Sequence, residues 1–588
     1  MQRARAIAEN LDRTARITKL RLFHQPVARS RAVQTNAIKE KSWGRKIVAQ
    51  MLGCAAKLLG DGQSERGAAN DIQVPRSTLR YWQQRVEQMQ APSGYKEFFE
   101  SPAGQQFLHA LVVALHVVVG LVVGGGIRPV IQILELVQLT AFVGSAIGSH
   151  HAIASEIEQQ VGEFGRSERS RLAESMAPKA ITVCEDETFH PQPCLVAIEP
   201  VSNFIVAEQY VEQRDAKTWD ETMDRALEQL PVSVVQSTSD EGKAILAHAQ
   251  QMQAHHAPDL FHVQHEANRA SALSLAHRVE HAEQAVSEAA AQLDKIEQQA
   301  SQWANSAHGP GRPPNFDKRK AEAEAALEQT HVELQDAHDL QERNREAIRG
   351  LGRDYHPVDL ATGEPRTAEQ IADKLQGHFD TLKDVAAKAS LPERSVARLS
   401  KAERQLPAMK ATIDFFHDQV QQRVNDLALA PEESKALTDY LIPAAYLERA
   451  ANRSAHAEDR QALRIVAHTR RSAGLHAFIL LGTSDQQRCM LEAEAAAGAD
   501  LFQRASSCVE GRNGQLSLRH HHLHHITPQR LEALTGVHNY FLQRPDGTTA
   551  AERFFGNKPN DLFQHLLNCT RPPPRPAAKR TRPATTLH

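Results

Sequence analysis

The chain has 588 residues, a net charge of −3 and 24% charged residues, a level typical of globular proteins. This composition excludes a polycation and a wholly disordered chain, and the length predicts roughly three to five domains rather than one. Six cysteines are scattered without a C-x-x-C pair, which argues against a structural zinc site or a disulfide framework and favours a reducing cytoplasm.

Basic residues concentrate at the two ends of this near-neutral chain. Residues 1–45 form a predicted basic N-terminal arm, and residues 559–588 form a Pro-rich, basic tail that we expect to be disordered. Positive charge at both ends suggests contacts with phosphate groups. A tail that is simply solvated is the alternative explanation for the C-terminal end.

Residues 46–95 predict a helix-turn-helix DNA-binding domain. Segment 47–58 is a predicted helix, and a second, short helix capped by Ser64 precedes a turn. The next helix is basic and aromatic, which suits insertion into a major groove. A plain helical hairpin is the alternative. The predicted DNA contacts in this domain are Arg76, Arg80 and Arg85.

Residues 96–175 predict a second helical domain. Its most apolar run, 107–123, lies at the short limit for a membrane span. The run contains two histidines and leads into three consecutive glycines. We therefore expect a buried helix of a globular domain rather than a transmembrane helix.

Residues 176–265 change to short runs rich in β-branched residues, separated by polar breaks. The predicted order is three strands, a helix, a strand, a helix and a short final strand. This order is typical of an RNase H-like fold, in which helices flank a mixed sheet. The predicted strands are 181–190, 194–202, 203–211, 232–239 and 260–263, and the predicted helices are 216–230 and 241–253.

Residues 266–500 are predicted to be a large all-helical insertion into this core, whose second half follows at 501–558. Apolar residues recur every seven positions over 279–303, and a break rich in Gly and Pro precedes a second helical arm. The pattern predicts an antiparallel coiled-coil hairpin over 266–350, which also admits a role in dimerisation. The predicted fold class is therefore α+β and multidomain.

The predicted strands identify two acidic residues as candidate ligands. Asp186 lies within the first strand, and Asp240 directly follows the fourth strand, before a helix. Strand ends are where α/β sheets place ligands, and neighbouring strands would bring the two carboxylates together. In a regular strand, the adjacent Glu185 and Glu187 point to the opposite face. An exposed strand carboxylate and a helix N-cap are the alternatives for Asp186 and Asp240.

The segments ITVCEDETFH, VVQSTSDEGKAIL and DLFHVQHE resemble the first half of a DDE transposase of bacterial insertion sequences. The segment SSCVEGRNGQLSLRHHH is similar to the helix that carries the third acid in that family, and it supplies Glu510, with Glu448 as a competing candidate. An all-helical insertion before the third acid is similar to the layout of hAT-like transposases. The resemblance covers roughly residues 176–270 and 500–555.

The resemblance implies that Asp186, Asp240 and Glu510 are both the catalytic and the metal-binding residues. They would hold two Mg²⁺ or Mn²⁺ ions, which prefer oxygen ligands, for cleavage and transfer of DNA strands. The element that begins at Asp259 is similar to one at the start of the hAT insertion, so His262 and His265 are possible accessory residues or packed core histidines. Further predicted DNA contacts, with a solvated helix face as the alternative, are Arg512, Asn513 and Arg519.

We therefore expect a DNA transposase that acts on transposon-end DNA and target DNA, as a homodimer or higher homo-oligomer, in a bacterial cytoplasm near the nucleoid and away from membranes. The alternatives are another RNase H-like nuclease, such as a junction resolvase, and a non-catalytic DNA-binding protein derived from a transposase. The histidine run at 520–525 favours polar or DNA-facing side chains over a zinc site, because no cysteine lies near it.

Overall fold

A computed structural model of the chain describes residues 45–576, except 88, 90, 190, 191, 308, 310 and 524. The predicted basic arm, apart from Arg45, and the end of the predicted tail lie outside these residues. The chain divides into two compact units, one ending at Glu87 and the other beginning at Gln88. The described residues are mostly helical with one mixed five-stranded sheet, which confirms the α+β fold class.

The described part of the first unit, from residue 45 onward, contains three helices around a small apolar core. The Ser64 side chain caps the second helix by accepting a hydrogen bond from the Gly67 N–H, as expected. Leu79 and Trp82 turn inward from the third helix, so its polar residues face outward. The helices are α2 (Arg45–Gly60), α3 (Glu65–Asp71) and α4 (Arg76–Glu87).

The second unit begins with helices that belong to the same hydrophobic core as the sheet. The stretch Pro102–Val123 is long and apolar enough to cross a membrane by length and composition. However, Leu108, Val113 and Val117 pack in one core with strand residues and the C-terminal helices, so the stretch serves as a core helix. The elements are α5 (Ser93–Phe99), α6 (Pro102–Leu115), η1 (His116–Val123), α7 (Ile127–Leu136), η2 (Leu139–Ala141) and α8 (Ile147–Glu174).

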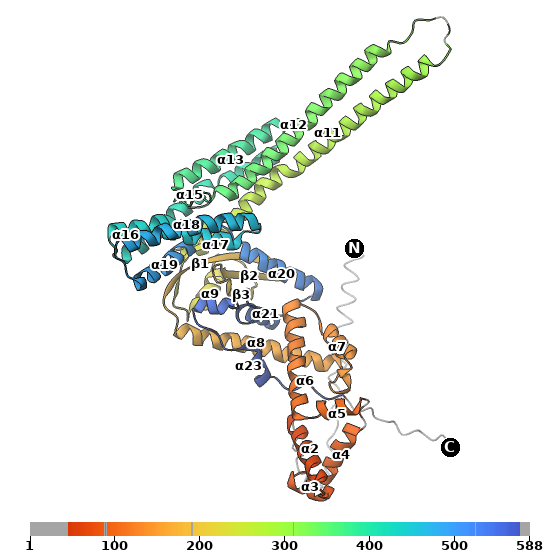
Figure 1. Cartoon of the computed structure of the whole chain (residues 1–588), viewed down its shortest axis with the longest axis vertical. Helices are drawn as coiled ribbons and strands as arrows, with labels where there is room; N and C mark the ends of the chain where they lie inside the picture. The colour runs from red at the N-terminus through yellow and green to blue at the C-terminus, as the bar shows by residue number, and fades with distance from the viewer. Residues whose placement is uncertain are drawn as a thin grey trace, which may run out of the picture. The chain divides into compact units, whose positions relative to one another are not determined.

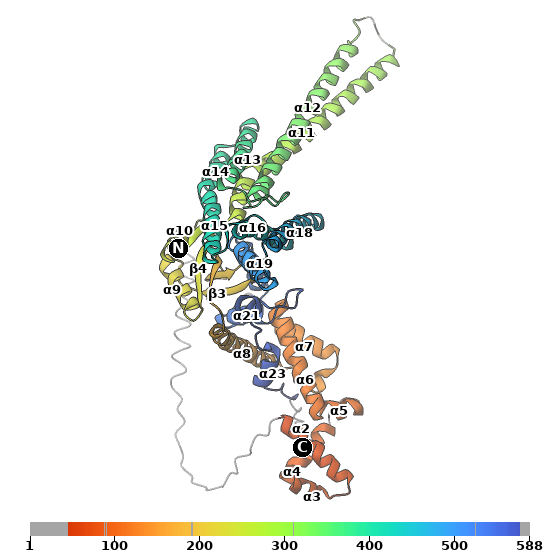
Figure 2. The same ribbon diagram turned by 60° about the vertical axis from the view of Figure 1, so that its left-hand side comes forward.

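The sheet has the strand order β3-β2-β1-β4-β5. Strands β1, β2 and β3 form an antiparallel meander, whereas β4 and β5 run parallel to β1. Helices α9 (Ala216–Leu227) and α10 (Lys243–Gln251) lie together on one side of the strands (Figure 2). The strands are β1 (Lys179–Phe189), β2 (Pro193–Glu199), β3 (Phe204–Tyr210), β4 (Val232–Ser239) and β5 (His255–Pro258).

The last strand corrects one prediction. Residues 260–263, predicted as a strand, form the first turn of helix α11 (Leu260–Ala304), and the strand lies earlier, at β5. Asp259 caps this helix by accepting a hydrogen bond from the Phe261 N–H. Leu260, Val263 and Ala267 are buried at helical spacing. The predicted strand 260–263 was too short to show this periodicity.

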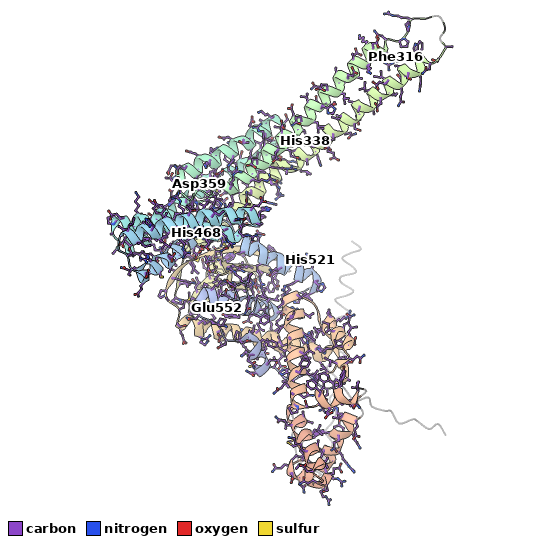
Figure 3. The ribbon with its side chains drawn as sticks, viewed as in Figure 1. Phe316, His338, Asp359, His468, His521 and Glu552 are labelled. Carbon is purple, nitrogen blue, oxygen red and sulfur yellow. The ribbon has the colours of Figure 1, made fainter. Side chains whose placement is uncertain are left out.

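A block of helices lies in the sequence between the two parts of the sheet core, after β5 and before α20 (Ser507–Leu523). Figure 1 shows α11 and α12 (Phe316–Asp354) side by side, and Figure 3 places Phe316 near the far end of this pair. The other helices share a second hydrophobic core at the base of the pair. They are α13 (Ala368–Lys388), α14 (Glu393–Glu403), α15 (Leu406–Asp426), α16 (Pro431–Ala436), η3 (Leu437–Leu441), α17 (Ile442–Arg453), α18 (Ala457–Leu480) and α19 (Asp485–Asp500).

The C-terminal helices return to the sheet, and one of them corrects the predicted disordered tail. Within 559–576, residues Leu562–Cys569 form α23, and Leu562 and Leu566 are buried in the first core. The Gly144 N–H donates to the Pro574 carbonyl at 2.8 Å, so the chain beyond α23 is also attached. The remaining helices are α20 (Ser507–Leu523), α21 (Pro528–Tyr540) and α22 (Ala550–Phe555).

Candidate active site

Strands β1 and β4 bring Asp186 and Asp240 to the same edge of the sheet. The parallel pairing sets Cys184 opposite Thr238, and both acids lie two residues further along their chains. Neighbouring strands are about 4.8 Å apart, so continuing this register places the two residues side by side. Asp240 follows β4 directly, and the Gly242 N–H donates to its carboxylate at 3.1 Å. Both acids are half-buried.

Helix α20 covers this edge and supplies the third acid. The Asn513 side-chain amide donates to the Asp186 carboxylate, with 2.7 Å between Nδ2 and Oδ2. Glu510 lies three residues before Asn513, so the two side chains share one face of the helix. The structure therefore brings Asp186, Asp240 and Glu510 together from a strand, a strand end and a later helix. The competing candidate Glu448 is exposed on α17, in the helical block.

The buried Asp259 fixes the start of α20. Its carboxylate accepts from the Ser506 N–H at 3.1 Å and from the Ser506 hydroxyl at 2.8 Å. Next to this contact, the Leu260 N–H donates to the Arg504 carbonyl at 2.9 Å. The two ends of the helical block are thus joined, and Glu510 follows Ser506 by one helical turn. The sequence associated Asp259 only with His262 and gave no sign of this positioning role.

Of the two predicted accessory histidines, the structure brings only His262 to the acids. Its Nε2 lies 3.4 Å from Glu510 Oε1 and 3.7 Å from Asp259 Oδ2. His265 lies one turn further along α11, is exposed and stacks on the ring of Phe261. An active-site role is therefore a prediction for His262 rather than for His265.

The carboxylates influence one another electrostatically. The pKa of Asp186 is raised from 3.8 to about 7, mainly by burial and in part by the negative charges of Glu510 and Asp240. The Glu187 N–H, which donates to Asp186, and the nearby His262 act in the opposite direction. Asp186 is thus only partly ionised near neutral pH, and a positive charge beside it would favour the ionised form.

The donor set fits hard divalent cations, although the carboxylates are not arranged around one. Carboxylate oxygens are the ligands that Mg²⁺ and Mn²⁺ prefer, and binding of a cation would relieve the repulsion that raises the pKa of Asp186. Among the described residues, no group of three or more His, Cys, Asp or Glu side chains is positioned to hold a metal ion. Asp186 is instead bound to Asn513, and Glu510 is beside His262.

A cavity of about 270 Å³ opens beside Asp240. Its acidic lining combines Asp240 and Glu241 from the end of β4 with Asp259 and Glu266. Lys401 of helix α14 lines the same cavity, so the helical block contributes a basic side chain beside the acids. The sequence did not single out this lysine, because it lies 161 positions from Asp240 in a segment without a recognisable pattern.

The opposite face of β1 carries a second polar cluster, which is buried except for part of Asp220. Glu185 and His248 are buried, and the Glu185 Oε1 lies 3.4 Å from the His248 Nε2. His248 also contacts Asp220, and Ser237 donates to Glu185. Burial lowers the pKa of His248, but the two carboxylates outweigh burial and raise the pKa overall. The neighbouring Glu187 contacts Trp219 of α9, so both glutamates point away from Asp186, as predicted.

Two predicted DNA contacts on α20 have internal partners instead. Arg512 is buried and forms a bidentate ion pair with the buried Glu208 of β3, with 2.7 Å between Nε and Oε1. Arg519 donates to the carbonyls of Leu121 and Val122 at the end of η1. Burial lowers the pKa of Arg519 to about 10. Neither guanidinium faces a DNA phosphate in this arrangement, and Asn513 is bound to Asp186.

Of the predicted contacts in the first unit, Arg76 and Arg80 are exposed and Arg85 is half-buried. Arg76 and Arg80 both pair with Glu65 of α3, at 2.7 Å and 3.1 Å, and about half of each arginine side chain is exposed. Arg85 donates to the Tyr81 hydroxyl at 3.4 Å. These ion pairs are open to water, so they are weak enough to exchange for other anions.

The histidine run lies at the end of α20, where Figure 3 labels His521. The described histidines of this run, His520, His521, His522 and His525, do not form a metal-binding group with other His, Cys, Asp or Glu residues. The rings of His520 and His521 contact each other.

Comparison with known proteins gives one family match. A family of unknown function (DUF6399) matches residues 437–582, about a quarter of the chain. The matched segment runs from η3 through α23, so it includes Glu510 and excludes Asp186 and Asp240. No curated protein and no solved structure matches the chain.

Proposed function

We propose that this protein is a DDE-type DNA transposase that cleaves transposon ends and transfers the strands into target DNA. The observation that carries the proposal is the meeting of three acids from distant segments. The β1–β4 register puts Asp186 beside Asp240, and the hydrogen bond from Asn513 to Asp186 brings the Glu510 face of α20 to them. Paired divalent cations in phosphoryl-transfer enzymes use such carboxylates.

The sheet supports the same proposal. The order β3-β2-β1-β4-β5, with an antiparallel meander followed by parallel strands, is the order expected of an RNase H-like fold. The helical block, including the long pair proposed as a coiled coil, leaves this core after β5 and returns just before α20. This layout is similar to that of the hAT-like transposases named above.

In the proposed reaction, Asp186, Asp240 and Glu510 would hold Mg²⁺ or Mn²⁺ at the edge of the sheet. The bound cations would activate the attacking oxygen and stabilise the leaving oxygen. Asn513 orients the Asp186 carboxylate, while His262 and the Asp259–Ser506 contact hold Glu510 over it. The oxygen of a water molecule bonds to phosphorus, and the bond to the 3′ oxygen breaks to give a 3′-hydroxyl. That hydroxyl then attacks a phosphodiester of the target DNA.

The first unit is the proposed reader of the transposon end. The exposed side of α4 presents Arg76, Arg80, Tyr81 and Gln84, which lie on one face of the helix. These side chains suit a helix placed in a major groove, where the arginines bind phosphates or guanine. A homodimer or higher oligomer, with one subunit at each transposon end, belongs to the same proposal, as does a place near the bacterial nucleoid.

Strand cleavage tests the proposal directly. The substrate is DNA that carries the sequences flanking the coding region, and the readout is nicking that depends on Mg²⁺. We expect Asp186→Asn and Asp240→Asn to abolish cleavage and to leave binding of the same DNA unchanged. Glu187→Gln is the matched control, because Glu187 is next to Asp186 but pairs with Arg214 on the other face. Undiminished cleavage by either aspartate variant would refute the assignment.

A second candidate function is that of a non-catalytic DNA-binding protein derived from a transposase. The observation in its favour is that the described residues contain no ready-made metal-binding group. Titration of the intact protein with Mn²⁺ distinguishes the two candidates. A transposase binds the ion through the three acids, so Glu510→Gln weakens binding, whereas the non-catalytic protein shows the same weak binding with and without that change.

A further inference from the structure

A second cavity, of about 590 Å³, lies within the helical block and is lined with arginines. Its walls come from the end of α12, from α17 and the start of α18, and from the segment that leads into α20. Cavities of a few hundred cubic ångströms are typical of sites for small molecules or parts of larger ones. The arginines that line it are Arg349, Arg353, Arg449, Arg453 and Arg504.

Three of these arginines are held in place mainly by neutral oxygens. Arg449 donates to the carbonyls of Ala499 and Phe502, and Arg504 donates to those of Gly352 and Tyr355. Arg453 donates to the Pro200 carbonyl and to the Gln503 side chain, each at 3.3 Å. These contacts orient the guanidinium groups without neutralising them.

The acids near these three arginines do not balance their charge. Within the described part of the chain, their only ion pair joins Arg449 and Asp500, with 3.7 Å between Nε and Oδ1. Asp459 also lines the cavity, and Glu199 acts on Arg449 from further away. The pKa of Arg449 is lowered to about 10, mainly by burial and in part by the positive charge of Arg453. An anion placed between these groups would remove this repulsion.

The remaining walls suit an organic anion better than a bare ion. Phe502 and Tyr446 are buried in the cavity wall, with the Tyr446 hydroxyl bound to His356. On the adjacent face of α18, Arg460, Arg464 and His468 line a second groove of about 510 Å³. Figure 3 labels His468 on this helix. The basic surface therefore continues beyond the cavity. A guanidinium group can donate two parallel hydrogen bonds to one phosphate group, so arginines favour phosphate as a partner.

We propose that the cavity lined by Arg449, Arg453 and Arg504 binds the phosphate group of a nucleotide, either in a DNA strand or free. The rim arginines Arg349 and Arg353 extend the site toward solvent. Each rim arginine also pairs with an exposed acid of its own helix, Glu342 or Glu346, and can exchange that acid for phosphate. This site is separate from the three acids and does not depend on cleavage.

The test uses the full-length protein in buffer without divalent ions, so that cleavage plays no part. The probes are a short fluorescent oligothymidylate and a fluorescent nucleoside triphosphate, and inorganic pyrophosphate competes against each. The key variant is the double change Arg349→Ala with Arg453→Ala. Arg345→Ala is the matched control, because Arg345 and Arg349 contact the same Glu342, at 3.7 Å and 3.6 Å, but Arg345 does not line the cavity.

We expect the double variant to bind at least one probe about 10-fold or more weakly, with an unchanged melting temperature. For the oligothymidylate, the slope of log K against log salt should fall by about 1.4, or about 0.7 for each lost phosphate contact. Binding of only the oligothymidylate identifies a DNA strand as the source of the phosphate. Binding of the triphosphate, with displacement by pyrophosphate, identifies a free nucleotide. Equal losses in Arg345→Ala and in the double variant, or no binding of either probe, would overturn the proposal.

Discussion

The two faces of strand β1 carry adjacent carboxylates whose burial and charged neighbours differ. Glu185 is enclosed with Ser237 and His248, and the histidine is itself held between two acids. Asp186, the next residue, is half-buried beside Asp240 and Glu510 and has the neutral Asn513 as its nearest partner on α20. On one face, the buried glutamate is therefore paired with a histidine, whereas on the other face Asp186 lies among further acids and its hydrogen-bond partner is a neutral amide.

This difference separates a group that holds the fold together from a group that is available for chemistry. Buried charges that have internal partners are costly to disturb, since removal of one partner leaves the other unpaired in the interior. Like charges near solvent store repulsion that a ligand can relieve, and such perturbed groups are characteristic of functional sites. Four predictions follow the contrast: three substitutions in order of decreasing expected effect, and then the pH dependence of stability.

Replacement of the third acid should produce the largest effect. We expect Glu510→Gln to reduce Mg²⁺-dependent strand cleavage by about 10³-fold or more, which is about 4 kcal/mol at the transition state. The melting temperature should stay within experimental error, because Glu510 is partly exposed. Glu448→Gln, on the exposed face of α17, should leave cleavage unchanged. Equal cleavage by both variants would show that Glu510 is not part of the proposed active site.

Replacement of Glu185, on the opposite face of β1 from Asp186, should lower the stability of the protein. Glu185→Ala would leave His248 paired only with Asp220 and would remove the acceptor of the Ser237 hydroxyl. We expect the free energy of unfolding to fall by about 3 kcal/mol, as measured by urea denaturation. Glu185→Gln should cost less, because the amide still accepts a hydrogen bond. A change of less than about 0.5 kcal/mol for the alanine variant would show that the cluster is not structural.

Asp259 connects the two halves of the site, so its loss should affect both properties moderately. Asp259→Ala removes two hydrogen bonds to Ser506 and the cap of α11. We expect about 2 kcal/mol of lost stability, together with slower cleavage because Glu510 is less well held. Single-turnover cleavage at saturating Mg²⁺ measures the second effect. Normal cleavage in a destabilised protein would limit Asp259 to a structural role.

The last prediction is a pair of pH dependences in the metal-free protein. Asp186 has a folded-state pKa of about 7 against 3.8 ordinarily, so between these values the folded state binds more protons than the unfolded state. Stability therefore falls as the pH rises through this window, and Asp186→Asn should flatten the fall. His248, whose pKa is raised above 6.5, contributes stability that is lost as the pH rises through that higher value. At pH 8, Mg²⁺ should restore the stability lost through Asp186 but not the stability lost through His248. Thermal unfolding with and without the ion would measure this difference.

Local patterns were sufficient to predict much of the sheet core. The alternation of β-branched residues predicted β1 through β4 to within two or three residues, and Asp240 was placed correctly at the end of β4. The Ser64 cap and the opposite orientations of Asp186 and its glutamate neighbours were also correct. These features depend on neighbours in sequence or on strand periodicity, which a single chain displays directly.

Features that depend on distant partners could not be predicted in this way. Arg512 looked like a DNA contact because its partner Glu208 lies 304 positions earlier. The internal partners of Arg519 and the helix α23 were missed for the same reason, since both are fixed by helices near the start of the second unit. Strand β5 was missed because it is four residues long and is held by β4 and by stacking of His255 on Phe415.

The contact between Asp259 and Ser506 also sets the order in which the site can be completed during synthesis. The two residues are 247 positions apart, so a ribosome that has made all five strands must still add the entire helical block before α20 exists. At about 5–20 residues per second, this interval lasts roughly 12–50 seconds. Throughout that time, the nascent chain contains Asp186 and Asp240 but not Glu510, so the proposed site stays incomplete until α20 has been made.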